Sequence, residues 1–346
     1  MLGKTRTELE ALCVERGYEA YRGRQIFGWL YQKRVPSFDA MRNLPDQLTS
    51  RLEADRFVLG ALAPSRQELS NDGTKKYLFP TRGGGFVEAA LIPDGERLTL
   101  CLSTQVGCRR GCVFCQTARQ GFQGNLDTGE VINQLHSLPE IDTVTNIVYM
   151  GMGEPLDNLT AVLRSIELFT DQDGYALPLR RITVSTVGIL PQLRTLLDSS
   201  AVNLAISVHS PFHEQRRKLM PVENVTPLAD TIALIRERRE DRKRRVTAEY
   251  TLFAGVNDTI EHARALARLL AGLSIRVNLI PYHQIEGSDL RPSTRADIDR
   301  FRDWLGEKDV RAFVRESRGQ DINAACGMLW TRKITVDPAA LRNAPA

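Results

Sequence analysis

The sequence predicts an α/β protein: a partial (β/α)6 barrel, preceded by a small helical domain and a short β-rich connector. Three observations support this prediction. The chain has 346 residues, of which 42% are hydrophobic, enough for one large α/β domain and a smaller appendage. Amphipathic helical patterns fill residues 1–60. From Leu98 onward, apolar β-branched runs alternate with helix-like segments, which is typical of a parallel sheet covered by helices.

Residues 1–60 are predicted to form the helical domain. Apolar residues recur at helical spacing in residues 5–17 and in residues 22–35, so each segment has one face to bury. Cys13 lies on such a face and is expected to be a core residue without chemistry. Basic residues near the aromatics of the second segment either contact RNA phosphates or form the solvated face of a helix; they are Arg22, Arg24, Lys33 and Arg34.

Residues 61–97 are predicted to be the β-rich connector. Asn71-Asp72-Gly73 is a strong turn signal, and two strand-like runs follow it, residues 75–80 and 86–93. Glu88 lies among apolar neighbours in the second run. Alternation along a strand puts its carboxylate on the solvent face, and the residues alone favour this interpretation.

Residues 98–346 are predicted to form the barrel. Six strand-like runs occur there: LTLCLS, NIVYMGMG, RRITVSTVG, VNLAISVHS, VTAEYTLF and IRVNLIPYH. A seventh run, VRAFVRES, precedes the C-terminal segment, and Asp127 with Glu130 predicts a capping box for a helix over residues 128–138. Because working residues of such barrels lie at the C-terminal ends of strands, the candidates are Cys108, Glu154, Ser185, Ser207, His209 and Asn278.

The composition indicates a cytoplasmic protein that does not span a membrane. No run approaches the ~18 apolar residues of a membrane span, and the opening MLGKTRTELE is unlike a signal peptide. A cytoplasmic chain keeps its thiols reduced, so a framework of disulfides is not expected. The net charge of +4 favours polyanionic partners only mildly.

Three cysteines follow the first barrel run with the spacing C-x3-C-x2-C: Cys108, Cys112 and Cys115. Thiolates are the usual ligands of iron–sulfur clusters, and these gaps are short enough for one loop to surround a cluster. Three ligands would leave one iron of a four-iron cluster open to a substrate or cofactor. The alternatives are a zinc site with a distant fourth ligand and plain buried thiols. The spacing favours the cluster, since zinc sites more often contain C-x2-C pairs.

Polar residues at the other strand ends allow two interpretations. In GMGEP the glycines would let backbone approach a ligand whose ammonium contacts the Gly153 carbonyl and the Glu154 carboxylate. A tight turn with a capping acid fits the same letters. The strand-end residues Ser185, Ser207 and Asn278 could each cap a helix, and His209 could be a core histidine. Convergence on one barrel mouth favours a ligand pocket.

Two further cysteines and one basic run remain open to interpretation. Cys326, between small residues in a predicted loop, is either a buried small hydrophobe or an accessible thiolate. Cys101, on the first barrel strand, has the same two interpretations. The run RERREDRKRR, from Arg236 to Arg245, either follows an RNA backbone or is a solvated helix end, and its interspersed acids favour the helix end.

The cysteine spacing, with Phe114 before the last cysteine, resembles the signature of the radical S-adenosylmethionine (SAM) enzymes. Further motifs occur in matching order: STQVGC, MGMGEP, RRITVST, ISVHSP, VNLIP and DINAACG. Together they resemble the RlmN/Cfr family of radical SAM RNA-adenine methyltransferases, closest to its RlmN branch. The resemblance extends from the N-terminal helices to about Leu329, so it covers nearly the whole chain.

The resemblance implies a fold and a set of binding residues. The fold would be a radical SAM partial barrel with a C-terminal methyl-carrier loop. Cys108, Cys112 and Cys115 would bind a 4Fe–4S cluster whose open iron chelates SAM. The SAM site would be formed by Gly153, Glu154, Ser185, Ser207, Val208, His209 and Asn278.

The resemblance also implies a mechanism that uses two SAM molecules per turnover. Cys326 would take a methyl group from the first SAM, and a deoxyadenosyl radical from the second would abstract hydrogen from that S-methyl group. The methylene radical would add to an adenine carbon, with Glu88 as the proton acceptor. Cys101 would then release the methylated RNA by forming a transient disulfide with Cys326. A radical route suits an sp2 carbon that is a poor nucleophile.

Within the family, the resemblance favours methylation of adenine C2 in 23S rRNA, with tRNA as a further substrate of some members. Pro155 and the stretch TARQGF match the C2 branch, whereas HSPFHEQRRKLMP is closer to the antibiotic-resistance (Cfr-like) branch, which methylates C8. Met328 departs from the usual Gln after Cys-Gly, which bears on substrate positioning. An electron donor of flavodoxin type, no membrane partner and a monomeric state complete these expectations.

Two hypotheses from other classes compete with this one. An RNA-binding protein that has lost turnover would have no reason to keep all five matching cysteines. A radical SAM enzyme acting on a peptide or another non-RNA substrate would have no RNA affinity and no need for residues 1–60. Salt-dependent RNA binding that weakens without those residues would count against it.

Overall fold

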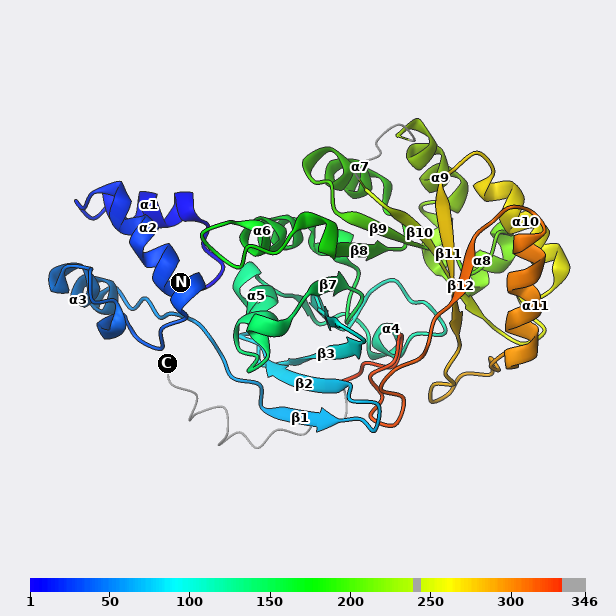
Figure 1. Cartoon of the computed structure of the whole chain (residues 1–346), viewed down its shortest axis with the longest axis horizontal. Helices are drawn as coiled ribbons and strands as arrows, with labels where there is room; N and C mark the ends of the chain where they lie inside the picture. The colour runs from blue at the N-terminus through cyan, green and yellow to red at the C-terminus, as the bar shows by residue number, and fades with distance from the viewer. Residues whose placement is uncertain (239–243, 332–346) are drawn as a thin grey trace.

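Figure 1 shows the computed structural model, which describes residues 1–238 and 244–331. The helices are α1 (Arg6–Val14), α2 (Ala20–Gly28), α3 (Asp46–Ala54), α4 (Gln116–Gln120), α5 (Thr128–His136), α6 (Leu159–Thr170), α7 (Leu190–Ser199), α8 (His213–Leu219), α9 (Leu228–Glu237), α10 (Ile260–Leu270) and α11 (Arg295–Gly306). The strands are β1 (Arg66–Leu69), β2 (Lys75–Pro80), β3 (Phe86–Asp94), β4 (Arg97–Cys101), β5 (Gln105–Val106), β6 (Gly124–Asn125), β7 (Asn146–Tyr149), β8 (Ile182–Thr186), β9 (Asn203–Ser207), β10 (Val246–Leu252), β11 (Ile275–Pro281) and β12 (Ala312–Val314).

One curled sheet of ten strands organises the molecule, in the order β1-β2-β3-β4-β7-β8-β9-β10-β11-β12. The pairs from β1 to β4 are antiparallel. The pairs from β4 to β12 are parallel. The six predicted barrel runs form β4 and β7–β11, the seventh run forms β12, and the connector runs form β2 and β3. The predicted fold class is therefore confirmed, and the connector strands continue the barrel sheet.

The barrel strands are buried because helices cover their outer face (Figure 1). Ile147 on β7, Leu204 on β9 and Val277 on β11 are all but fully buried. Parallel neighbours require crossover connections, which α6, α7, α9, α10 and α11 provide between successive strands. The predicted capping box is present at the start of α5, where the Glu130 N–H donates to Asp127 at 2.8 Å and the Asp127 N–H donates to Glu130 at 2.8 Å.

Helices α1–α3 lie at the end of the molecule nearest α5 and α6 (Figure 1). Cys13 is fully buried in this region, as the sequence predicts. Arg6 on α1 pairs with Asp171 at 2.6 Å, and the rings of Tyr31 and Tyr175 have centroids 5.7 Å apart. Ion-pair and aromatic contacts thus attach the N-terminal helices to the barrel.

Three arginines in and after α2 are held by other groups of the protein. Arg24 pairs with Glu10 at 3.0 Å, and Arg34 pairs with Asp142 at 2.8 Å. Arg22 donates to the main-chain oxygen of Asn43 at 2.9 Å. These guanidinium groups therefore have a structural role in the free protein.

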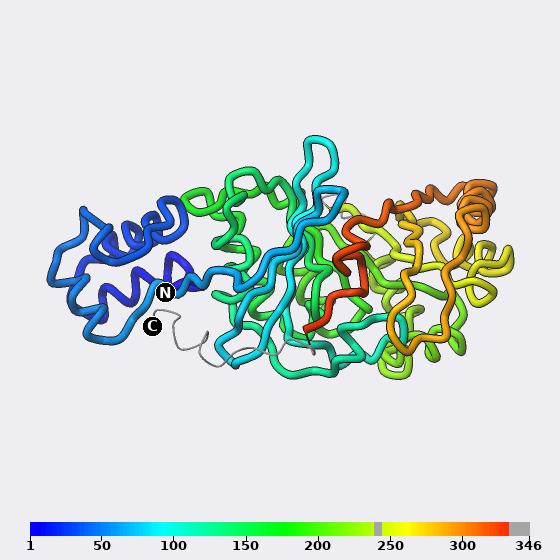
Figure 2. Tube along the Cα trace, turned by 90° about the horizontal axis from the view of Figure 1, so that it is seen from below, coloured from blue at the N-terminus to red at the C-terminus, as the bar shows by residue number. Residues whose placement is uncertain are grey.

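The segment after β12 returns to the antiparallel arm β1–β3, as Figure 2 shows in red beside cyan strands. Asp321 accepts hydrogen bonds from the Ser70 hydroxyl at 2.5 Å and the Asn71 N–H at 3.1 Å. The chain thereby closes over the open side of the sheet before it reaches Cys326.

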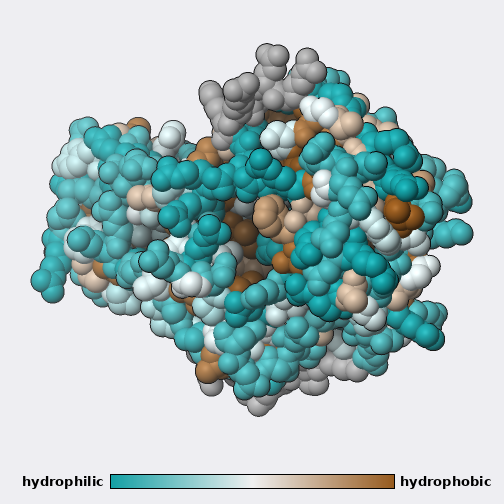
Figure 3. All heavy atoms as spheres, turned by 45° about the vertical axis from the view of Figure 1, so that its right-hand side comes forward, coloured by the Kyte–Doolittle hydropathy of each residue, from teal (hydrophilic) through white to brown (hydrophobic). Residues whose placement is uncertain are grey.

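The surface in Figure 3 is mostly hydrophilic, with hydrophobic residues around a hollow near the middle of the view. Within residues 1–238 and 244–331, no helix is long and apolar enough to cross a membrane.

Candidate active site

A cavity of about 250 Å³ lies at the C-terminal ends of the barrel strands and collects most of the predicted site residues. Its lining includes Cys101, Cys108, Cys112, Cys115, Cys326, Gly153, Glu154, Ser185, Ser207 and His209. These residues come from β4, β8 and β9, from the segments that follow β7 and β9, and from two loops far apart in the chain. Five of the six cysteines therefore share one cavity.

The loop that carries Cys108, Cys112 and Cys115 is held firmly in place. Gly107 precedes it with φ +71°, and a Cβ there would lie 1.7 Å from the Gly121 carbonyl oxygen, so only glycine fits this turn. The Val113 N–H donates to the Leu219 carbonyl at 3.0 Å. Neighbouring contacts thus fix the loop on both sides of its second cysteine.

An ion pair adds to this support, because Arg110 donates to Asp157 through two guanidinium nitrogens, Nη2 to Oδ1 and Nε to Oδ2, the latter at 2.7 Å. A bidentate arginine–carboxylate pair fixes orientation as well as distance. It anchors the loop to the segment that follows β7.

The three loop thiols have the properties of cluster ligands. Burial raises the pKa of Cys108 to about 12 and the pKa of Cys112 well above its ordinary value, and repulsion from Cys115 acts in the same direction on both. A cationic cluster would stabilise all three thiolates, so these residues fit one. Among the described residues, no group of three or more His, Cys, Asp or Glu side chains is arranged to hold a single metal ion.

Glu154 is a buried carboxylate at the end of β7. It accepts hydrogen bonds from the Thr186 hydroxyl at 2.6 Å and from the N–H groups of Val187 at 3.0 Å and Leu156 at 3.1 Å. Burial raises the pKa of Glu154 to about 7 despite these donors. A ligand ammonium at this position would favour the carboxylate form.

Gly153 is required by protein packing. Its φ is +100°, and a Cβ would lie 2.6 Å from the side chain of Gln105. The close approach of the β5 segment is therefore sufficient to explain glycine at this position, without the ligand contact that the sequence suggests.

Ser185, Ser207 and His209 face the cavity from the ends of two adjacent strands. The serine hydroxyls form no hydrogen bond with any described residue, which leaves them available to a ligand. His209 has φ +55°, and its Nδ1 accepts the Thr251 N–H at 2.9 Å, so its Nε2 carries the proton. Burial lowers the pKa of His209 to about 3, so the ring is neutral.

Two predicted SAM-site residues are absent from the lining of this cavity. Val208 is fully buried, and its carbonyl accepts from the Arg216 guanidinium at 3.1 Å. Asn278 lines a second cavity at the opposite ends of the strands, and its Nδ2 donates to Glu249 at 2.8 Å. A ligand in the cysteine cavity that contacts Asn278 would therefore also lie next to Glu249, which accepts this hydrogen bond.

Cys101 and Cys326 approach the cavity from opposite parts of the chain. Cys101 is buried on β4 against Ala90 and Ala324, whereas Cys326 is exposed to the cavity. Both are free thiols in this structure. Burial raises the pKa of Cys101 to about 12. Desolvation by the surrounding cavity raises the pKa of Cys326 to about 11, although this thiol is exposed within it, and the nearby charge of Arg315 opposes both shifts.

The residues after Cys326, Gly327–Thr331, form a strap across α4 and β3. The Gln116 N–H donates to the Gly327 carbonyl at 2.7 Å, the Thr117 hydroxyl to the Leu329 carbonyl at 2.7 Å, and the Gln120 amide to Thr331 at 2.8 Å. Since α4 begins at the residue after Cys115, the strap ties the Cys326 loop directly to the three-cysteine loop.

Glu88 corrects an expectation from the sequence. Strand alternation places it on the solvent face, but it is only 5% exposed. It pairs with Lys76 at 3.0 Å and accepts the Trp330 N–H of the strap at 2.8 Å. Burial raises the pKa of this carboxyl group. Glu88 lies behind the cavity wall, where it anchors the strap.

Comparisons with known proteins agree with this geometry. The sequence profile of the ribosomal RNA large subunit methyltransferase N-terminal domain matches residues 1–58, and that of the radical SAM superfamily matches residues 102–270. A Parabacteroides distasonis protein named probable dual-specificity RNA methyltransferase RlmN is 45% identical over 333 residues, 96% of this chain and 97% of that protein. The chain belongs to the RlmN family.

Two further comparisons span almost the whole chain. The dual-specificity RNA methyltransferase RlmN of Geobacter sulfurreducens is 42% identical over 332 residues, 96% of this chain and 92% of that protein. A solved radical SAM methyltransferase from Sphaerobacter thermophilus has a TM-score of 0.89 at 40% identity, covering 94% of this chain and 98% of that one. Membership of this radical SAM family implies a 4Fe–4S cluster and SAM as cofactors.

Arg216 organises the RlmN-family site, and its role was not predicted from the sequence. Arg216 is fully buried and donates to the carbonyl oxygens of Ser207 at 2.9 Å and Val187 at 3.1 Å. Arg216 also forms an ion pair with buried Glu223. Arg216 therefore holds the ends of β8 and β9 in position. A charged residue inside an otherwise solvated-looking helix, HEQRRKL, gives no signal of this burial.

Glu249 was also missed, although a carboxylate in the middle of the apolar run VTAEYTLF is a recognisable signal. It is 5% exposed, lines the cysteine cavity, and stands in register with Ser207 on β9 and Asn278 on β11. At Met328 the main-chain N–H donates to the Ala325 carbonyl at 3.0 Å and helps to close the turn after Cys326, a contact that does not depend on the side chain.

Proposed function

We propose that this protein methylates C2 of adenine in 23S rRNA, with tRNA as a second substrate, through an S-methylcysteine intermediate at Cys326. The observation that carries the proposal is the meeting of two free thiols, Cys101 and Cys326, with the three-cysteine loop in one cavity. A radical SAM enzyme that only cleaves SAM needs the loop but has no use for the other two thiols.

In this proposal each thiol has a separate role. When bound at the three-cysteine loop, the cluster and SAM supply a deoxyadenosyl radical. Cys326, exposed to the cavity, carries the methyl carbon that becomes linked to adenine. Cys101 then attacks the Cys326 sulfur, so that an S–S bond forms and the bond from sulfur to the methyl carbon breaks. Two SAM molecules are used per methyl group transferred.

Glu88 is proposed as the proton acceptor, the role that the family resemblance implies. Its raised pKa supports this role, because a carboxylate with a higher pKa is a stronger base. Its hydrogen bond with Trp330 links it to the strap that carries Cys326. Since Glu88 stands behind the cavity wall, we propose that the proton reaches it through the strap region once RNA is bound.

The remaining ligands are proposed from the same resemblance. SAM would contact Gly153 and Glu154, the hydroxyls of Ser185 and Ser207, and His209, all of which line the cavity. The resemblance adds Val208 and Asn278, which stand outside this lining. Residues 1–60 would serve as an RNA-binding domain, residues 61–97 as a connector and residues 98–346 as the catalytic barrel. The protein would act in the cytoplasm as a monomer reduced by a flavodoxin-type donor.

Nucleoside mass spectrometry tests the proposal after anaerobic reaction of the reconstituted enzyme with rRNA or tRNA, SAM and a reductant. 2-Methyladenosine that disappears in Cys326→Ala and Cys101→Ala is the expected result. 8-Methyladenosine would move the protein to the Cfr-like reaction with the same thiol chemistry. No methylated adenosine, despite an assembled cluster and SAM cleavage, would contradict the RNA assignment.

A further inference from the structure

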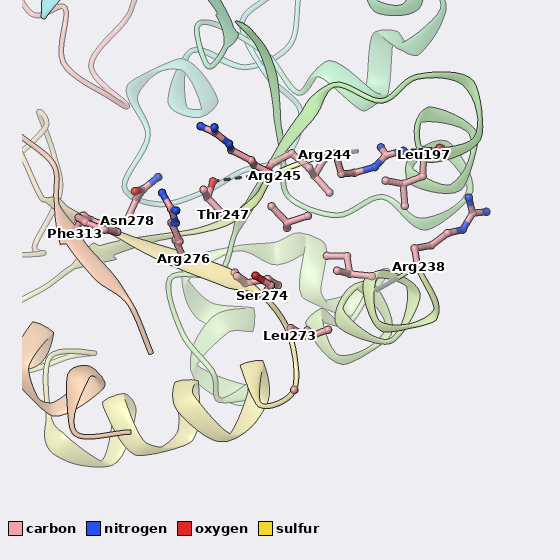
Figure 4. A pocket seen from close by; sticks show the side chains of 15 residues that line it. Leu197, Arg238, Arg244, Arg245, Thr247, Leu273, Ser274, Arg276, Asn278 and Phe313 are labelled. Atoms are coloured by element: carbon pink, nitrogen blue, oxygen red, sulfur yellow. Dashed lines mark hydrogen bonds between the residues drawn. The ribbon is translucent and has the colours of Figure 1, made fainter. Parts of the chain in front are cut away.

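A second and larger cavity, of about 1180 Å³, lies at the N-terminal ends of β10 and β11, opposite the cysteine cavity. Its walls come from those two strands, from α7 and α9, and from the turn after α10. Figure 4 shows this cavity with its labelled side chains. Neither the proposed catalytic mechanism nor the family resemblance assigns it a role.

Positive charge dominates this cavity. Four arginines line it, Arg238, Arg244, Arg245 and Arg276, and no Asp or Glu is found among its described lining residues. Two of them serve the fold, since Arg238 pairs with Asp198 and Arg244 donates to the Leu197 carbonyl at 2.9 Å. Arg244 accordingly turns toward Leu197 in Figure 4.

The other two arginines carry charge that the fold does not use. Arg245 and Arg276 form no ion pair with any described residue. Other exposed arginines are paired, as Arg295 is with Asp299 at 2.9 Å. Figure 4 shows Arg245 and Arg276 extending to the same side of the β10–β11 pair as Thr247 and Asn278. Two converging guanidinium groups without a counter-charge suit phosphate oxygens.

An exposed aromatic ring stands beside them. Phe313 on β12 is 50% exposed, and the Arg276 guanidinium lies 5.9 Å from its ring centroid. Ser274 and Asn278 add a hydroxyl and an amide to the same wall. Cations, small polar groups and a free aromatic face are the combination by which proteins hold a flexible nucleic-acid strand.

The basic run singled out in the sequence contributes to this cavity from both ends. Arg238 and Arg244–Arg245 lie in the described residues, while residues 239–243 of that run lie outside them. Arg276 comes from a different strand and becomes a neighbour only through the parallel pairing of Thr247 with Arg276. The sequence alone therefore shows three of the four arginines, and the fold adds Arg276.

We propose that Arg245 and Arg276 form a second contact site for RNA, which binds phosphate groups of the substrate strand at the end of the barrel opposite the cysteines. This inference rests on the proposed RNA substrate and adds the place where part of that RNA is held. Phe313 offers its ring to a base of the same strand. The site contributes affinity and register, and it takes no part in the chemistry of Cys326.

The test is the salt dependence of RNA affinity. Kd for a substrate RNA fragment is measured by fluorescence anisotropy at several salt concentrations for the wild type, Arg245→Gln, Arg276→Gln and the double variant. Arg264→Gln is the matched control, since Arg264 on the exposed face of α10 forms no ion pair with a described residue. SAM binding without RNA is measured in parallel and is expected to stay unchanged.

Each lost phosphate contact is expected to lower the slope of log K against log salt by about 0.7, and to weaken binding about fivefold near ~0.1 M salt. The control should match the wild type. An unchanged slope and Kd in the double variant, with normal RNA binding by the wild type, would overturn this site and leave the proposed function intact. A wild type without salt-dependent RNA affinity would overturn both.

A second measurement uses the unmodified sequence, so it does not depend on how the variants fold. Phenylglyoxal labels exposed arginines of the wild-type protein, and mass spectrometry locates the label with and without RNA. Protection of Arg245 and Arg276, but not Arg264, supports the site. Equal protection by AMP or inorganic phosphate alone would identify a small-anion site and contradict the RNA contact, as would protection only by an acidic protein.

Discussion

The three-cysteine loop and the Cys326 strap bring sulfur atoms to the same cavity, but they are built in different ways. The loop has buried or half-buried cysteines, and charged groups brace it, Arg110 with Asp157 beside it and Arg216 with Glu223 behind it. The strap exposes Cys326 and is held beyond it by hydrogen bonds, chiefly to main-chain groups of Gly327–Thr331.

This difference suits two different functions of a thiol. A permanent metal ligand needs a fixed position, because cluster geometry tolerates little movement. A sulfur that gains and loses partners needs room on one side and a secure attachment on the other. The comparison teaches that the structure supports the neighbours of Cys326 and leaves the sulfur itself unrestrained.

The largest expected effect separates the two cysteine types directly. Cys112→Ser should abolish cluster assembly, and with it all SAM cleavage, because one of three ligands is lost. Cys326→Ser should keep full iron content and cluster absorbance while abolishing methylated RNA. Iron analysis, visible spectroscopy and nucleoside mass spectrometry make the comparison. Loss of the cluster in Cys326→Ser would show that the strap is part of the cluster site.

Next in size is the buried ion pair behind the loop. Arg216→Met removes the buried guanidinium partner of Glu223 and leaves this carboxylate with only His213 and the Leu228 N–H, so it should lower the free energy of unfolding by about 3–5 kcal/mol. SAM affinity should fall as well, because the carbonyl oxygens of Ser207 and Val187 lose their donor. Thermal unfolding and calorimetry check both effects.

The double variant Arg216→Met/Glu223→Leu is the control for charge burial. It should regain much of the stability, because no uncompensated charge remains, but SAM affinity should stay low. Recovery of SAM affinity in the double variant would contradict a positioning role for Arg216.

A smaller effect is expected on the strap. Thr117→Val removes the hydrogen bond to the Leu329 carbonyl and should cost about 1 kcal/mol locally. Hydrogen exchange should accelerate in Gly327–Thr331 and not in the three-cysteine loop, and RNA methylation should fall while SAM cleavage persists. Uniform acceleration in both regions would mean that the loop and the strap form a single unit.

The smallest effect is the pH dependence contributed by Glu88. Its pKa is raised in the folded protein, so between its unfolded pKa and its folded pKa the folded state binds more protons. Stability contributed by this group is therefore present below the unfolded pKa and is lost as pH rises through the folded pKa. Glu88→Gln should flatten this slope in denaturant unfolding measured from pH 4 to 8. Parallel curves for the two proteins would contradict it.

Local patterns were sufficient to predict the barrel and the three-cysteine loop. Alternating apolar runs identify β4 and β7–β11 because each parallel strand is buried on both faces, and the spacing of the cysteines lies within one loop. The convergence of Glu154, Ser185, Ser207 and His209 could also be predicted, because parallel strands end at the same edge.

Contacts between distant residues could not be predicted in this way. Glu88 is buried because Lys76 and the N–H of Trp330, 242 residues later, supply its partners, and neither contact has a local signal. The docking of the strap on α4 and the hydrogen bonds that Arg216 donates likewise have no local signal in the sequence. The register that joins Thr247 to Arg276 is another example, since it depends on the pairing of two strands.

The strap also sets an order of events during synthesis. Cys115 and Cys326 are separated by 326 − 115 = 211 residues, which a ribosome adds in roughly 10–40 seconds at about 5–20 residues per second. The three-cysteine loop leaves the ribosome first, and the Cys326 thiol reaches it only when the strap docks on α4. During that interval the three-cysteine loop exists without the Cys326 thiol, so bonding between Cys326 and the loop cysteines can begin only after the strap has been made.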